Sequence, residues 1–413
     1  MALFLYSKGK EYSYEDLFIA ARESLASSRV QVPSNEPFMV FSKLLGCLIC
    51  GLSCEIIDSD LTDLEIRNLG MSSESLLLGN KNEINLFYSI DEFVQALYEK
   101  KIKGSISLFT SGTTGRPKKV SHTITNLLRN IKKSESHIHD VWAFAYNPTH
   151  MAGIQVFFQA LLNFNPLIDV FTSTEADFKY LSEHYGINRI SATPTFYRKI
   201  ISSTKEPWLN IRSVTCGGEK LDRGLYQALK ITFPNARIYN IYASTEAGVL
   251  FQAINEIFII PEYLNGKVMV SDSGEILVHE SLIGNSEDLI LDNGWYHSGD
   301  IVELLAPNKF IFKSRISEMI NVGGDKVNPN EIEELISAME FVYDVRVFGR
   351  RNSVTGEIVA AEVVLKNDVD KKKNYIEEIQ KRLKQKVQPY KIPQIIKIVD
   401  KLNVTNTGKK ARK

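Results

Sequence analysis

Residues 111–118 read SGTTGRPK, a run that combines glycines, hydroxyl side chains and one lysine. The glycines let the backbone bend tightly and approach a ligand closely. Backbone N–H groups and hydroxyls arranged in this way bind phosphate oxygens. The run is not a Walker A loop, because Arg116 and Pro117 interrupt the Gly-Lys-Ser/Thr ending of that motif. A phosphate loop and a ligand-free turn both remain open for this stretch, whose candidate ligand residues are Ser111, Gly112, Thr113, Thr114, Gly115 and Lys118.

The elements that flank this loop must position it. Residues 106–110 (ISLFT) are apolar and β-branched, which predicts a buried strand. In residues 120–133, Leu127, Leu128 and Ile131 are spaced like one face of a helix. We therefore expect the loop to lie between a strand and a helix.

A second group of residues suits a nucleotide. Val214 begins VTCGGE, and paired glycines at the end of a strand allow a flat ligand to lie against the backbone. An ordinary glycine turn explains this fragment equally well. Residues 238–248 read IYNIYASTEAG, in which Glu246 is a hard oxygen ligand suited to Mg²⁺. The alternative is a capped helix start at Ser244.

Three later segments complete the set of motifs. Residues 294–300 read GWYHSGD, and the Asp300 carboxylate is able to accept hydrogen bonds from two hydroxyls. Residues 313–333 combine a basic start with Gly323 and Gly324, and residues 402–413 read LNVTNTGKKARK. The last segment is either a functional loop or a solvated basic tail.

In this order, the motifs resemble those of the adenylate-forming enzymes: acyl- and aryl-CoA ligases, luciferases and peptide-synthetase adenylation domains. The resemblance covers nearly the whole chain, but the N-terminal region is shorter than is usual in the family. Departures from the family pattern are Ala243 for glycine, Ser298 for threonine, Ser314 for glycine, Ser317 for aspartate or lysine, and Asn321 for lysine.

The resemblance implies a role for each matching residue. ATP or AMP would contact the loop residues named above together with Gly217, Gly218, Glu219, Tyr242, Ala243, Ser244, Thr245, Asp300 and Arg315. Glu246 would hold Mg²⁺, and Lys409, Thr245 and His150 would be catalytic. The acyl pocket would be lined by His150, Ala152, Cys216, Ala243 and Val249. Ser317 would be the hinge, and Gly323 and Gly324 would approach a pantetheine arm.

The segment Asn147–Gly153 (NPTHMAG) resembles the family's acyl-pocket segment and carries no carboxylate. Burying a substrate ammonium without a partner is costly, so we expect an acid without an α-amine. The first hypothesis is an ATP- and Mg²⁺-dependent coenzyme A ligase for an aryl or medium-chain acid. The second is a stand-alone enzyme that loads the phosphopantetheine of an acyl carrier protein. The third is a catalytically silent relative that binds nucleotide or a partner; Lys409, Glu246 and Asp300 argue against it.

The fold that the resemblance implies is α/β, with a large multilayer adenylation domain over 1–316 and a small mobile lid over 317–413. Local signals agree with alternating helices and strands. Ser13 with Asp16, and Ser89 with Glu92, approximate capping boxes. Asn328, followed by Pro329 and Glu331, predicts another helix start.

Composition narrows the partners and the compartment. Lys+Arg and Asp+Glu both number 49, and this balance argues against a nucleic-acid partner. Cys47, Cys50 and Cys54 lie in an apolar run without a second Cys/His pair, so they are interpreted as core cysteines rather than metal ligands. The apolar run of residues 39–57 is interrupted by Lys43 and Glu55, and the apolar start is too short for a signal peptide. We therefore expect no membrane span and a cytoplasmic protein.

Overall fold

The computed structural model describes residues 2–24, 29–31, 36–57, 66, 87–110, 118–201, 206–323, 325–352, 355–367, 369–370 and 373–403. Packing divides the chain into two compact units. The first comprises residues 1–219, 229–255 and 278–296, and the second comprises 220–228, 256–277 and 297–413. The two predicted domains, 1–316 and 317–413, differ from this grouping and stay a prediction.

An eight-stranded sheet forms the centre of the first unit, in the order β12-β11-β10-β9-β7-β8-β1-β2. Its six inner strands run parallel, and the two outermost strands, β2 and β12, each pair antiparallel with their neighbour. The strands are β1 Leu3–Ser7, β2 Lys10–Ser13, β7 Trp142–Phe144, β8 Leu167–Asp169, β9 Arg189–Ala192, β10 Ser213–Gly217, β11 Arg237–Ser244 and β12 Gly248–Ala253.

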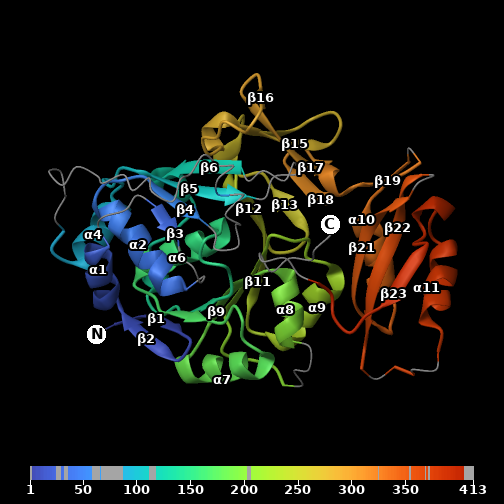
Figure 1. Cartoon of the computed structure of the whole chain (residues 1–413), viewed down its shortest axis with the longest axis horizontal. Helices are drawn as coiled ribbons and strands as arrows, with labels where there is room; N and C mark the ends of the chain where they lie inside the picture. The colour runs from blue at the N-terminus through green and yellow to red at the C-terminus, as the bar shows by residue number, and fades with distance from the viewer. Residues whose placement is uncertain are drawn as a thin grey trace. The chain divides into compact units, whose positions relative to one another are not determined.

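Helices cover this sheet (Figure 1). Apolar side chains of its strands, such as Phe4, Phe144 and Ile190, are fully buried. Phe41 and Phe157, from two different helices, stack with ring centroids 4.2 Å apart in one hydrophobic core cluster. Cys47 and Cys54 are buried in the same cluster, as predicted, whereas Cys50 is only half-buried at the C-cap of the helix Pro37–Ile49. The helices of this unit are α1 Tyr14–Glu23, α2 Pro37–Ile49, α4 Ile90–Tyr98, α5 Ile124–Leu127, α6 Met151–Asn163, α7 Glu175–Tyr185 and α8 Pro194–Ile201; α9 Arg223–Thr232 spans both units.

Two of the predicted helix starts are confirmed in the first unit. Ser13 Oγ accepts from the Asp16 N–H at 3.1 Å, and the Asp16 carboxylate accepts from the Ser13 N–H at 2.8 Å. Ser89 caps α4 by accepting from the Glu92 N–H at 3.2 Å. These caps satisfy N–H groups that have no partner within the helix, so a few neighbouring residues determine where the helix begins.

A four-stranded sheet, β3-β4-β5-β6, carries the phosphate-loop region. Its strands are β3 Arg29–Gln31, β4 Cys54–Ile57, β5 Ser105–Thr110 and β6 Lys118–Thr123. The predicted strand before the loop is confirmed, but the predicted helix over 120–133 is wrong. Lys118–Thr123 pairs antiparallel with β5, and helix follows only in the short α5. Pairing with β5 supplies backbone hydrogen bonds and a buried face for Val120, which outweighs the weak helical spacing.

The second unit holds most of a six-stranded sheet and all of a five-stranded one. The former contains β13 Ile257–Ile259, β14 Val268–Val270, β15 Glu275–His279, β16 Leu291–Asp292, β17 Trp295–Ala306 and β18 Lys309–Arg315. The latter contains β19 Ile320–Val322, β20 Asp325–Val327, β21 Val342–Asn352, β22 Gly356–Leu365 and β23 Ile395–Ile398. Helices α10 Pro329–Ser337 and α11 Tyr375–Lys384 share a core with the five-stranded sheet (Figure 1).

The predicted helix start at Asn328 is confirmed in part. Asn328 Oδ1 accepts from the Asn330 N–H at 3.0 Å, and Pro329 occupies the first turn. The Glu331 carboxylate instead accepts from Lys391 Nζ, at 2.9 Å to each oxygen. The sequence pattern near Asn328 predicts that the Glu331 side chain helps to cap the helix. In the structure, Lys391, 60 positions later in the chain, binds this side chain instead.

Candidate active site

The carboxyl edge of the eight-stranded sheet gathers most of the predicted site residues of the first unit. Parallel strands end at the same edge, and ligands of open α/β sheets bind there. Strands β7, β10 and β11 all lead into predicted motifs at this edge. The turns that follow them begin at Ala145, Gly218 and Thr245.

The turn after β7 places His150 at the start of α6. His150 is half-buried and occupies the N-cap position of α6, with extended backbone. A Cβ atom on Gly153 would lie 2.4 Å from the Asn147 carbonyl oxygen, so only glycine allows the turn to pack this closely. The half-buried Ala152 lies in the same first turn of the helix.

The turn after β10 requires glycine at one position. Gly218 has φ +83°, in the left-handed region that L-residues rarely adopt, and it is exposed. Glu219 Oε2 accepts from the Thr195 N–H at 2.9 Å, at the start of α8. The predicted nucleotide residue Glu219 thus also holds the start of α8. Cys216, predicted to line the acyl pocket, is fully buried.

The turn after β11 carries the second nucleotide motif. No helix begins at Ser244; β11 passes through a turn directly into the antiparallel β12, so that alternative is wrong. Ser244 Oγ accepts from the Ala247 N–H at 3.1 Å, which closes the turn. Tyr242 packs on Phe251 with ring centroids 5.4 Å apart. Residues 242–246 and Val249 are all half-buried.

The backbone of residues 245–249 is held by groups that the sequence analysis missed. His122 Nε2 lies 2.7 Å from the Thr245 carbonyl oxygen, and the Gly284 N–H donates to the Glu246 carbonyl at 2.7 Å. Arg129 Nη2 donates to the Ala247 carbonyl at 2.8 Å, and Asn130 Nδ2 donates to the Val249 carbonyl at 2.6 Å. We refer to residues 244–249 as the nucleotide turn. No local signal marks these partners, because they are distant in sequence from the turn.

Burial lowers the pKa of His122, and Arg129 adds to this effect. The side chain is only 2% exposed, so the imidazole remains neutral at physiological pH. A carbonyl oxygen only accepts, and therefore Nε2 carries the ring proton and donates it to Thr245.

The Glu246 side chain fits a magnesium ligand. It is half-buried, and it forms no hydrogen bond or ion pair with the residues that the structure describes. The contact that holds this residue is made by its carbonyl, which leaves the carboxylate available. Mg²⁺ in nucleotide sites is bound through one or two carboxylates, phosphate oxygens and several waters, so one available carboxylate suits it.

Asp300 and Arg315 lie together on adjacent strands of the second unit. They pair across β17 and β18, and Arg315 Nε lies 3.4 Å from Asp300 Oδ1. Asp300 is 7% exposed. Glu275, which the sequence analysis left without a role, accepts from the Gly299 N–H and contacts His297 Nδ1, both at 2.8 Å. This carboxylate fixes the turn that leads into Asp300.

The predicted hinge and thiol residues follow β18. Ser317 is exposed in a 3₁₀ turn, Ile316–Glu318, between β18 and β19. Gly323 has φ +62°, and its N–H donates to the Thr355 carbonyl at 2.8 Å. Lys118, the last residue of the phosphate-loop motif, begins β6 opposite Thr110. Ser111, Gly112, Thr113, Thr114, Gly115, Gly324 and Lys409 lie outside the described residues.

Sequence comparisons identify the family. The profile of the AMP-binding enzymes matches residues 104–273, and that of the AMP-binding enzyme C-terminal domain matches residues 331–409. The 4-hydroxybutyrate–CoA ligase 1 of Metallosphaera sedula is 26% identical over 349 residues, covering 74% of this chain and 60% of that protein. A 2-succinylbenzoate–CoA ligase of Staphylococcus epidermidis is 23% identical over 445 residues, covering 97% and 92%.

Solved structures share the fold. An o-succinylbenzoate coenzyme A synthetase from Bacillus subtilis, in complex with ATP and magnesium ion, aligns with a TM-score of 0.68 at 19% identity. The alignment covers 100% of this chain and 96% of that one. ATP-bound MatB from Rhodopseudomonas palustris aligns with a TM-score of 0.72 at 17% identity, covering 99% and 94%.

These matches bear on the predictions made from sequence. The two profile matches together cover more than half of the chain, and they confirm the recognised family. The structural matches confirm the α/β fold class. Among the residues that the structure describes, no helix is both long and apolar enough to cross a membrane. The chain belongs to the adenylate-forming superfamily of AMP-binding enzymes.

Proposed function

We propose that this chain is an AMP-forming carboxylate–coenzyme A ligase. The observation that carries the proposal is the nucleotide turn at the carboxyl edge of the sheet. Its backbone carbonyls are held by hydrogen bonds, while the Glu246 carboxylate forms no hydrogen bond or ion pair with the described residues. The similarity to named CoA ligases supports the same activity, although the chain spans only 60% of the length of the Metallosphaera relative.

In the first step, a carboxylate oxygen of the acid attacks the α-phosphorus of ATP. The bond to the leaving pyrophosphate breaks, and an acyl-adenylate stays bound. Thr245 donates its hydroxyl to the α-phosphate, and Lys409 and Lys118 supply positive charge near the phosphates. Positioned donors of this kind stabilise the charge that develops in the transition state.

Bound Mg²⁺ would be held by Glu246 and would neutralise the charge of the ATP phosphates. Asp300 would accept hydrogen bonds from the ribose hydroxyls, and Arg315 would hold the same sugar. Tyr242, Ala243, Ser244, Gly217, Gly218 and Glu219 would contact the adenine and its surroundings. His150, Ala152, Cys216, Ala243 and Val249 would line the acyl pocket.

In the second step, the thiol of coenzyme A attacks the acyl carbon of the adenylate. A carbon–sulfur bond forms, AMP leaves with the electron pair of the anhydride bond, and the thiol loses its proton. Gly323 and Gly324 would approach the pantetheine arm in this step, after a rotation at Ser317. Lys409 would serve only the first step.

The acceptor thiol separates the two enzymatic candidates. A carrier-protein loader would share the first step and differ only in the second. Mg·ATP and a panel of aryl, medium-chain and dicarboxylic acids should be tested for pyrophosphate release, with coenzyme A or a phosphopantetheinylated carrier protein as acceptor. We expect thioester formation with coenzyme A. Thioester on the carrier protein alone would favour the loader, and no pyrophosphate with any acid would contradict ligase activity.

Lys409→Ala tests the division of labour between the two steps. We expect adenylation to fall about 10²–10³-fold, the scale of losing one oxyanion-type contact. Attack by coenzyme A on supplied acyl-adenylate should fall far less. Equal losses in both steps would contradict the proposed roles.

A further inference from the structure

His122 lies in a chain of hydrogen bonds that ends on the nucleotide turn. Arg129 Nη1 donates to Asn126 Oδ1 at 2.8 Å, and Asn126 Nδ2 lies 3.3 Å from His122 Nδ1. His122 Nε2 then lies 2.7 Å from the Thr245 carbonyl oxygen. Arginine only donates and a carbonyl only accepts, so the two ends of the chain determine the direction of every bond. This direction requires the His122 ring to donate from Nε2 and accept at Nδ1.

We propose that His122 is a positioning residue for adenylation, holding Thr245 and Glu246 in place through the Thr245 carbonyl. The proposal rests on the proposed function and adds a residue to it. His122 does not reach the substrates through this contact. It acts through the backbone of the two residues to which the α-phosphate and the metal are assigned.

Close packing around the ring leaves it little freedom to adopt another position. A Cβ atom on Gly284 would lie 2.7 Å from His122 Cε1 and 2.8 Å from its Nε2. The same glycine donates its N–H to the Glu246 carbonyl at 2.7 Å. Residue 284 therefore confines the ring and holds the next carbonyl of the turn. Residues 121 and 285 exchange two backbone hydrogen bonds of 2.8 Å, which fix this approach.

The position of His122 in β6 connects the two nucleotide motifs. Strand β6 begins at Lys118, directly after the phosphate-loop residues, and reaches His122 four residues later. Thr245 lies 123 residues beyond His122 in the chain. One strand thus follows the first motif and fixes the backbone of the second. This arrangement explains why a buried polar residue is used here in place of an aliphatic one.

Two substitutions separate the hydrogen bond from the packing. His122→Leu removes the donor and retains an apolar side chain of moderate size. His122→Gln retains an N–H donor at the same number of bonds from Cα as Nε2. The variants are compared with the wild-type enzyme on an acid that the wild type activates. We expect kcat for pyrophosphate release to be about 10- to 100-fold lower in His122→Leu than in the wild type, which is the scale of a misplaced reacting group. We expect His122→Gln to recover most of this loss.

His137→Leu is a matched control before β7, at the amino edge of the eight-stranded sheet, whose carboxyl edge carries the nucleotide turn. His137 Nδ1 contacts Asp140 Oδ2 at 2.7 Å, so this substitution also removes a ring contact to a buried acceptor. It should lower the melting temperature and leave kcat within about twofold of the wild-type value. The reason is that substitutions at distant positions without shared partners act independently of one another. A purely structural role for His122 would give both leucine variants this same behaviour.

Amide hydrogen exchange of residues 244–249, measured without ligand, provides a second readout. We expect faster exchange in His122→Leu and unchanged exchange in His137→Leu and His122→Gln. Wild-type kcat in His122→Leu, or equal losses in the leucine and glutamine variants, would overturn the proposal. If the wild-type protein activates no acid, the ligase proposal fails. The exchange experiment then still decides the role of His122, since unchanged exchange in His122→Leu overturns it.

Discussion

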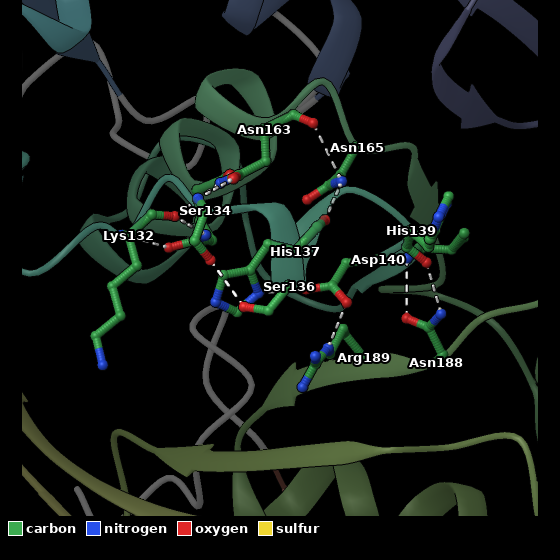
Figure 2. A network of polar contacts seen from close by, with 12 residues as sticks. Lys132, Ser134, Ser136, His137, His139, Asp140, Asn163, Asn165, Asn188 and Arg189 are labelled. Atoms are coloured by element: carbon green, nitrogen blue, oxygen red, sulfur yellow. Dashed lines mark hydrogen bonds and ion pairs between the residues drawn. The ribbon is translucent and has the colours of Figure 1, made fainter.

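The amino and carboxyl edges of the eight-stranded sheet, where its parallel strands begin and end, use polar side chains in different ways. At the amino edge, Asp140 accepts from Arg189 Nε at 2.8 Å and contacts His137 Nδ1 at 2.7 Å. Asn188 Oδ1 accepts from the Val141 N–H, and Asn165 Nδ2 donates to the His137 carbonyl. Figure 2 shows how this network joins the segments that precede β7, β8 and β9. Here side chains bond both to one another and to backbone groups, and together they connect the starts of three strands.

At the carboxyl edge, side chains from β6 and the residues after it engage the backbone carbonyls of a single turn. His122, Arg129 and Asn130 together reach the carbonyls of residues 245, 247 and 249. The Glu246 carboxylate, within the same turn, forms no hydrogen bond or ion pair with the described residues. A loop held through its backbone is ordered without using the side chains needed for a ligand. From this comparison we propose that the amino edge serves stability and the carboxyl edge serves binding.

Glu246→Gln should give the largest effect and tests the binding edge. Removing the only assigned metal-ligand charge should lower pyrophosphate release about 10²–10³-fold, on the scale of a lost electrostatic contact in a transition state. The melting temperature should change little, because the carboxylate forms no hydrogen bond or ion pair with the described residues that the substitution would remove. Glu183 is exposed, and Glu183→Gln is the control for removing a carboxylate charge away from the nucleotide turn. A large loss of stability without a loss of rate would reverse the roles assigned to the two edges.

Asp140→Asn tests the stability edge. Asp140 is 3% exposed and bonded to a guanidinium and an imidazole. Removing one charge of a buried pair leaves the other uncompensated, so the free energy of unfolding should fall by about 3 kcal/mol. Denaturant titration measures this loss, and kcat of the remaining folded enzyme should be unchanged. A drop in kcat that matches Glu246→Gln would remove the distinction between the edges.

Gly218→Ala and Gly217→Ala form a matched pair at the carboxyl edge. Alanine at Gly218 would adopt φ +83° at a cost of about 1–2 kcal/mol. At Gly217, the nearest atom to an added Cβ is 3.7 Å away, which is ordinary contact. We therefore expect Gly217→Ala to change the free energy of unfolding by less than about 0.5 kcal/mol. Equal costs at both positions would show that backbone conformation does not set the glycine requirement.

Asp169→Asn should give the smallest effect. It compares the carboxylate of Asp169, at the carboxyl edge, with that of Asp140, at the amino edge of the same sheet. Asp169 ends β8 and accepts from the Ser7 hydroxyl at 2.6 Å and the Phe171 N–H at 3.2 Å. Burial raises the pKa of this carboxyl above its usual value of 3.8, despite these hydrogen bonds. In the folded protein, the Asp169 carboxyl therefore stays protonated up to a higher pH than in the unfolded chain. The free energy of unfolding consequently falls as pH rises above about 4.

Denaturant titrations between pH 3.5 and 7 measure this slope, which asparagine should remove. Asparagine keeps both contacts, accepting from Phe171 and donating to Ser7. A wild-type slope of the opposite sign, attributable to Asp169, would contradict the assigned direction of the pKa shift.

Local signals in the sequence predicted the helix starts at Ser13 and Ser89, because both partners of each cap lie within three residues. The same local reasoning failed for residues 120–133. Their apolar spacing suits a helix, but pairing with Ser105–Thr110 makes the first part of the segment a strand. Glu331 shows the same limit, since its partner Lys391 follows 60 residues later.

By itself, the sequence determined the family and the α/β class, and it predicted which residues carry the chemistry. Glycine, hydroxyl and carboxylate groups are recognisable by type and short spacing, because each motif is contained in a few consecutive residues. Only the tertiary structure decided how the nucleotide turn is held. His122, Arg129 and Gly284 reach it from segments more than 30 residues away, and no local pattern records a hydrogen bond across that separation.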